Sequence, residues 1–216
     1  MAQPIPNNEE LAAALLWALG ENVPHDRTLE AEAIRLKAEK GSSGELLQKV
    51  ITLCSNPKTP MQLYLTAKAY SLLGSGFYSQ TIQSMREYLK TGGWDKLSGR
   101  SVMENGIQIN HLCMQRAADL TVLAMAQEGF GKLEDALESF TEAYRLEPYR
   151  AMHAVKAADL IVKLHGREEA LLFLRHQKQS RYYSPIKYTN TLGEVRYNEE
   201  FRRLLDAHIL KIGNME

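Results

Sequence analysis

The feature that most constrains the fold is an apolar pattern that occurs twice in this 216-residue chain at a constant offset. The stretch at 131–148, GKLEDALESFTEAYRLEP, follows a second apolar stretch, AADLTVLAMAQEGF, and a turn at 129–131 separates the two. When the sequence is compared with itself at this offset, small residues match small ones and large apolar residues match large ones: Ala124 with Ala158, Ala136 with Ala170, Leu137 with Leu171, and Phe140 with Leu174. The chain is therefore expected to contain two similar helical hairpins in succession.

Helical spacing of apolar residues continues through the rest of the chain. No β-branched run bounded by turn residues predicts a strand, so the fold class is expected to be all-α. Capping residues and helix breakers place helices at about 8–20, 28–40, 42–54, 59–73 and 78–89, and again from 111 onward. The stretch at 91–111 is expected to be an irregular insert, in which Trp94 either contacts a partner or, more simply, anchors the insert.

The first hairpin resembles the tetratricopeptide repeat family in the spacing of Leu120, Leu123 and Ala124 in its first helix, and of Ala136, Phe140, Ala143 and Pro148 in its second. A second copy follows at 151–184, at the period of this family, and a weaker copy precedes at 62–90. In such repeats, small residues let paired helices approach closely and large apolar residues fill the space between hairpins. The resemblance implies a right-handed superhelix of antiparallel helical hairpins.

We expect one continuous domain with three parts. Residues 1–60 form an N-terminal helical extension, within which 28–54 could be a further degenerate repeat. Residues 61–184 hold the repeats and the insert at 91–111, and residues 185–216 form a connector and a capping helix. On that helix an apolar stripe is expected to face the last repeat while charged residues face water: the stripe is Phe201, Leu204, Leu205, His208 and Ile209, and the charged residues are Arg202, Arg203, Asp206 and Lys211.

Composition argues against several classes of function. The 26 Lys and Arg residues balance the 26 Asp and Glu residues, and no basic stripe is present, so a nucleic-acid partner is not expected. The N-terminal apolar run follows Glu9 and Glu10 and is too short to cross a bilayer, which predicts a cytoplasmic protein without membrane insertion. Cys54 and Cys113 are expected to be buried thiols rather than a disulfide or a metal site.

No constellation of residues predicts catalysis. Metalloprotease, nucleophile-elbow, P-loop and dinucleotide-binding motifs are absent from the sequence, and the two cysteines do not have zinc spacing. The acidic pairs at 134–135, 168–169 and 199–200 stand in the first turns of expected helices, where the helix dipole accounts for them. We therefore expect no enzyme activity, no catalytic residue, no metal and no cofactor.

The resemblance implies instead that the first helix of each hairpin lines a concave groove for a protein or peptide partner. The expected lining is Leu63, Tyr70, Val122, Met125, Met152, Val155, Lys156 and Asp159, with Thr66, Ala67 and Thr121 beside them. Methionine adapts its shape and tyrosine combines apolar area with a polar tip, so this surface suits an amphipathic helix or an extended apolar segment. The expected function is a protein-binding scaffold, as an adaptor or a chaperone-like module.

An alternative stays open at this point. The same groove could be filled by the chain's own insert or tail, or by a second copy, which would make the protein a self-assembling structural module and a homo-oligomer. The segment SRYYSPIKY at 180–188 has two interpretations as well. Its tyrosines, Tyr182, Tyr183 and Tyr188, could form a rim for a partner, or they could pack the junction between the last repeat and the closing helix.

Overall fold

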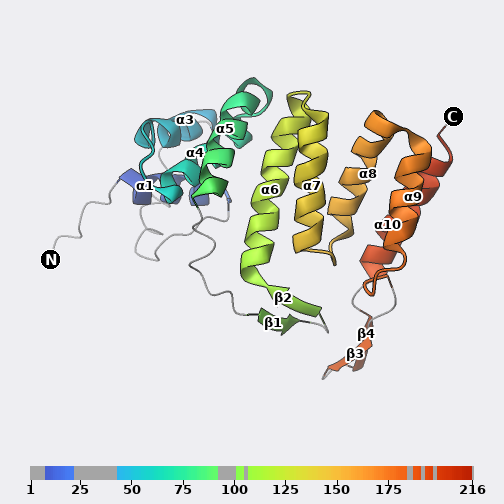
Figure 1. Cartoon of the computed structure of the whole chain (residues 1–216). Helices are drawn as coiled ribbons and strands as arrows, with labels where there is room; N and C mark the ends of the chain where they lie inside the picture. Colours follow the sequence, from blue (N-terminus) through green and yellow to red (C-terminus); the bar gives the residue numbers. More distant parts are fainter. Residues whose placement is uncertain are drawn as a thin grey trace. The chain divides into compact units, whose positions relative to one another are not determined.

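The computed structural model describes residues 8–21, 43–91, 101–104, 107–183, 187–190, 193–196 and 199–215. The chain falls into two compact units, Met1–Gly93 and Trp94–Glu216 (Figure 1). The described residues contain nine α-helices that pack as successive hairpins, so the predicted helical-hairpin fold is confirmed. The expected helix at 28–40 and the anchor Trp94 lie outside the described residues. The right-handed winding and the single continuous domain stay predictions.

The first unit is built from helices whose ends carry the expected signals. Thr59 caps α4 by accepting a hydrogen bond from the backbone N–H of Gln62, and a proline follows at the first helical position. Gly74 ends the same helix with a φ of 89°, a left-handed conformation that favours glycine. The elements are α1 (Asn8–Ala18), α3 (Ser43–Leu53), α4 (Pro60–Leu73), the 3-10 turn η2 (Ser75–Phe77) and α5 (Tyr78–Lys90).

A core of leucine, alanine and valine side chains joins α1, α3 and α4 in this unit. Cys54 lies in that core with 1% of its surface exposed, and burial together with the charge of Glu9 raises the pKa of its thiol to about 11. The thiol therefore stays protonated at neutral pH, and its expected role as a small buried hydrophobe is confirmed. The ammonium of Lys68 on α4 forms an ion pair with the carboxylate of Glu21 at 3.0 Å.

In the second unit, two helical hairpins follow each other along the chain. Gly131 and Gly166 make the two hairpin turns with φ values of 86° and 95°. The second helices begin at Leu133 and Arg167, which are separated by the same offset as Ala124 and Ala158, as the sequence period predicts. The hairpins consist of α6 (His111–Gly129) with α7 (Leu133–Leu146), and α8 (Ala151–His165) with α9 (Arg167–Gln177); the closing helix is α10 (Glu199–Gly213).

The packing between these hairpins repeats as well. Between the first and second hairpins, Phe140 is 1% exposed and lies against three alanines and Leu160; the alanines are Ala124, Ala136 and Ala157. Between the second hairpin and α10, the buried cluster contains Ala158, Ala170, Leu171 and Leu174 from the hairpin, and Phe201, Leu205 and Ile212 from the closing helix. The closing helix therefore occupies the place that the first helix of a further repeat would take.

Two short β-hairpins depart from the all-helical expectation. The insert at 91–111 was expected to be irregular, but β1 (Ser101–Glu104) pairs with β2 (Ile107–Asn110), and the register places Val102 opposite Ile109. The connector before α10 contains β3 (Lys187–Asn190) paired with β4 (Gly193–Arg196). Both pairs are antiparallel and two-stranded, and both lie outside the helical repeats, which they do not interrupt.

Candidate partner-binding face

The first helices of the two hairpins in the second unit, α6 and α8, run in the same direction, and in Figure 1 α7 lies between them. Thr121 of α6 and His153 of α8 meet across them, with 3.4 Å between the Thr121 hydroxyl and the His153 Nδ1. One turn beyond Thr121, Met125 is 56% exposed, and immediately before His153, Met152 is 48% exposed. Two flexible apolar side chains therefore reach solvent from neighbouring helices of one unit.

Each of these two helices also carries a valine within one turn of its methionine. Val122 and Val155 are half-buried, and with Met125 and Met152 they form the surface that we name the methionine face. No segment among the described residues buries the two methionines, so in that part of the chain the face is open rather than filled internally. Lys156, also half-buried, lies beside Val155 on α8.

Asp159, the last residue of the predicted lining, contacts the closing helix. Its Oδ1 lies 3.0 Å from the Nε2 of His208 and 3.5 Å from the Nζ of Lys211, both on α10. The carboxylate is therefore partnered within the chain, and α10 marks the border of the methionine face on this side.

The predicted residues of the first unit have a different environment. Leu63 and Tyr70 are half-buried on α4, and the Tyr70 ring stacks on Phe77 at a centroid distance of 5.7 Å. Thr66 and Ala67 were expected beside them in the groove, but they are 6% and 0% exposed and belong to the interior. That expectation is wrong because other elements of the unit cover this side of α4. A groove that joins Leu63 and Tyr70 to the methionine face stays a prediction.

A buried polar cluster between α7 and α8 was not predicted from the sequence. Glu147 is 1% exposed, and its carboxylate accepts a hydrogen bond from the hydroxyl of Tyr149 at 2.8 Å. The same carboxylate lies 3.2 Å from the Nε2 of His153 and 3.3 Å from the Nε of Arg150. Through His153 and Thr121 the cluster connects the turn between the hairpins to α6. Its members bind one another, and these contacts hold the junction between the two hairpins together.

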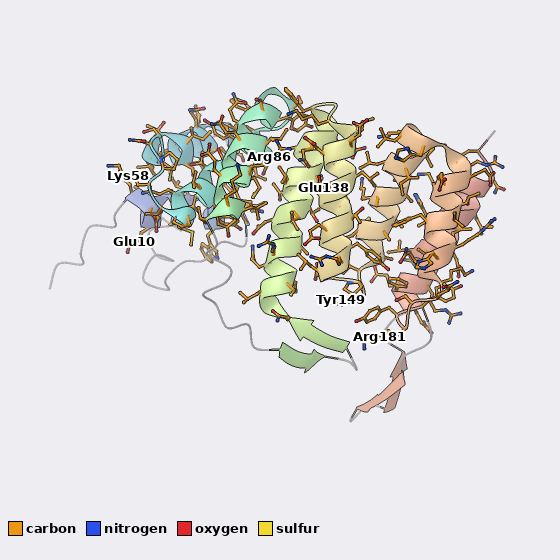
Figure 2. The ribbon with its side chains drawn as sticks, viewed as in Figure 1. Glu10, Lys58, Arg86, Glu138, Tyr149 and Arg181 are labelled. Atoms are coloured by element: carbon orange, nitrogen blue, oxygen red, sulfur yellow. The ribbon has the colours of Figure 1, made fainter. Side chains whose placement is uncertain are left out.

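The tyrosines that follow α9 pack the junction with the closing helix. Tyr182 is buried against Tyr149, and the Tyr183 hydroxyl donates to both carboxylate oxygens of Asp206 at 2.9 and 3.0 Å. Figure 2 shows Tyr149 and Arg181 at the same end of the unit, and the Arg181 guanidinium lies over the Tyr182 ring. The packing interpretation is therefore confirmed for Tyr182 and Tyr183; the side chain of Tyr188 lies outside the described residues.

The charged residues of α10 follow the expectation only in part. The apolar stripe is confirmed, with Phe201, Leu205 and His208 buried. Arg202 and Asp206 were expected to face water, but the Arg202 guanidinium lies 5.5 Å from the centre of the Tyr183 ring and Asp206 binds the Tyr183 hydroxyl. The connector brings Tyr183 back onto this flank of the helix, which the periodicity of α10 alone does not indicate.

The burial of His208 against α8 is expected to make the stability of the second unit depend on pH. Burial lowers the pKa of its imidazole below the usual value of 6.5; the Asp159 carboxylate opposes this shift, whereas Lys211 and Lys156 add to it. The folded-state pKa of His208 lies below its unfolded value. The contribution of neutral His208 to stability is therefore fully present above pH 6.5 and is lost as the pH falls through the folded-state pKa.

We therefore expect the free energy of unfolding to decrease as the pH is lowered from 7.5 towards 5.5, which urea titrations at several pH values would measure. The substitution His208→Gln should flatten this dependence. His165→Gln, at an exposed position at the end of α8, is the matched control and should leave the dependence unchanged. An equal slope in the parent and in His208→Gln would contradict the assignment.

The described residues offer no site for a metal and no membrane span. Across the described segments from 8 to 215, no group of three or more His, Cys, Asp or Glu residues could hold a metal ion. In the same segments, no helix has the length and apolar character needed to cross a bilayer.

Comparison with known proteins gives matches among solved structures. Solved structures of MamA resemble this chain. Two structures of MamA from AMB-1 cover 78% and 83% of this chain and 88% and 92% of their own, with 13% and 12% identity and a TM-score of 0.48 each. MamA from Desulfovibrio magneticus RS-1 covers 71% of this chain and 91% of its own, with 15% identity and a TM-score of 0.31. No protein-family model and no curated protein matches the sequence. MamA is a tetratricopeptide repeat protein.

Proposed function

We propose that the protein is a protein-interaction scaffold whose methionine face binds an amphipathic segment of a partner protein. The observation that carries the proposal is the exposure of Met125 and Met152, at 56% and 48%, on two neighbouring helices of one unit. Exposed apolar side chains that gather on one surface are typical of binding sites. Methionine is suited to this role because it is flexible and polarisable and can adapt to different partners.

The surroundings of the face favour an apolar ligand over a charged one. Asp159 is engaged by His208 and Lys211, so it offers little net charge to a partner. Lys156 lies beside Val155, and a single lysine would give a charged partner only one cation to bind. A partner segment with apolar side chains one helical turn apart would cover Met125 and Met152 and would bury Val122 and Val155 further.

The proposal is tested by site-specific photo-crosslinking in the native host. A benzophenone amino acid is placed at position 125, at position 152, or at position 130 as a control, because Phe130 is 52% exposed in the same unit but lies outside the methionine face. We expect one partner to be cross-linked from positions 125 and 152 and not from position 130.

Substitution provides the quantitative measurement. Met125→Glu and Met152→Glu should each weaken binding of that partner by at least about tenfold, because a charge would be buried at the contact. Their melting temperatures should match that of Phe130→Glu, since all three side chains are exposed in the free protein. Equal cross-linking from all three positions, or unchanged binding in both methionine variants, would rule out the methionine face as the binding site.

A further inference from the structure

A second exposed surface lies on the last hairpin, at one end of the second unit (Figure 1). Its centre is formed by Leu172 of α9 and Leu210 of α10, each 65% exposed. These are the most exposed of the large apolar side chains that the structure describes. Neither residue belongs to the methionine face, and two such side chains on adjacent helices are candidates for a second contact surface.

Two contacts fix how α9 and α10 lie against each other. Near the start of α9, Arg167 donates a hydrogen bond to the backbone carbonyl of Met215, and after its end the Lys178 ammonium lies 3.0 Å from Asp206. The helices are therefore antiparallel neighbours. Leu172 is five residues after Arg167 and Leu210 is five residues before Met215, so the two leucines lie at the same level of adjacent helices.

The side of α10 that carries Leu210 has no neighbour among the described helices. On one flank of α10, Asp206 meets Tyr183 and Lys178; on the other flank, His208 and Lys211 meet Asp159 of α8. Leu210 lies between these two flanks, on the side away from the buried stripe.

The charges around Leu172 are arranged so that the surface is complementary to itself. Glu168 and Glu169 precede Leu172 by four and three residues, and Arg175 and His176 follow it by three and four; all four side chains are exposed. If two α9 helices meet in antiparallel orientation at Leu172, the acidic end of each lies opposite the basic end of the other. The helix dipole favours this charge order within each copy, but it does not account for an exposed leucine at the centre.

We propose that this α9 end face, formed by Glu168, Glu169, Leu172, Arg175, His176 and Leu210, binds a second copy of the chain about a two-fold axis near Leu172. In a two-fold contact the same patch serves both copies, as this charge pattern requires. The helix has 11 residues and is about 16 Å long, so the contact buries less than the roughly 800 Å² per partner of a standard interface. The dimer is therefore weak and depends on concentration, with a dissociation constant on the order of tens of micromolar or higher.

The test is sedimentation velocity of the full chain between about 1 µM and 1 mM, a range set by that affinity. The parent is expected to change from monomer to dimer across this range. Leu172→Glu should raise the dissociation constant by at least about tenfold. Leu72→Glu, which alters a 42% exposed leucine in the first unit, is the matched control and should leave the dissociation constant unchanged.

Charge reversal tests the antiparallel geometry and separates a specific contact from general stickiness. Glu169→Arg and Arg175→Glu should each weaken the dimer, because position 169 of one copy lies opposite position 175 of the other and each change places like charges opposite one another. The double variant with both changes should restore it, since the complementarity is reversed but intact. Melting temperatures confirm that all variants fold. A parent chain that stays monomeric to 1 mM, a double variant that does not recover, or an equal loss in Leu72→Glu would overturn the proposal. None of these outcomes depends on whether the methionine face binds a partner.

Discussion

Replacement of Phe140 by alanine is expected to lower the stability of the second unit by about 3–5 kcal/mol, the usual range for deletion of a fully buried aromatic side chain. Phe140 is 1% exposed and lies against alanines from three helices and against Leu160. The alanines around Phe140 carry only a methyl group, so they cannot move a side chain into the vacated space and the cavity would stay largely open. The loss should therefore fall in the upper part of the range.

A urea titration monitored by hydrogen exchange of the backbone amides within 111–213 would measure this loss of stability in the second unit. Phe130→Ala is the matched control, because Phe130 is 52% exposed at the turn after α6 and its removal should change the stability by no more than about 0.5 kcal/mol. Similar losses for the two phenylalanines would show that the packing between the hairpins has been assigned wrongly.

The substitution Glu147→Ala is expected to have a comparable effect, about 3–5 kcal/mol, because removal of one partner from a buried ionic cluster leaves the other partners without their acceptor. Glu147 is 1% exposed and His153 is 5% exposed, and both lie at the junction of the two hairpins. Glu147→Gln keeps the shape and one carbonyl acceptor, so it should cost less than the alanine substitution.

Glu142 provides the control within α7. Its carboxylate binds Arg145 with two hydrogen bonds of 2.8 Å, but this pair lies at the surface. Glu142→Ala should therefore cost no more than about 0.5 kcal/mol. The comparison of the two glutamates by urea unfolding separates burial from ion pairing. If Glu142→Ala cost as much as Glu147→Ala, burial would not be the deciding factor.

The helical hairpins could be predicted from the sequence because their packing depends on residue size at a fixed period. Alanines such as Ala124 and Ala158 recur at that period, and each is fully buried where two helices approach. Helix ends were predictable for a similar reason, since Thr59 and Gly74 act on the backbone within a few residues of their own positions.

The first β-hairpin had a local signal that the helical interpretation overlooked. In the segment VMENGIQIN at 102–110, an Asn-Gly pair stands between an apolar stretch and an alternating one, IQIN, which is a strong hairpin signal. The segment KYTNTLGEVR at 187–196 has weaker turn chemistry and fewer apolar residues, so its pairing was harder to predict.

The candidate site was predictable only in part. The helical period indicated that Met125 and Met152 face away from their own hairpins, and both are exposed. It could not indicate that other elements cover Thr66 and Ala67, because that contact depends on the tertiary arrangement of the first unit. The Glu147 cluster was missed for the same reason: its members come from a turn and two helices, and only the fold brings His153 and Thr121 together.

The closing helix also bears on how such a chain can change in length. Since α10 packs on the second hairpin through Phe201, Leu205 and Ile212 as a further first helix would, a duplicated hairpin placed between α9 and α10 would meet compatible surfaces on both sides. Growth of the array by whole modules would then leave its terminal element untouched, and binding surface could be gained without a new core.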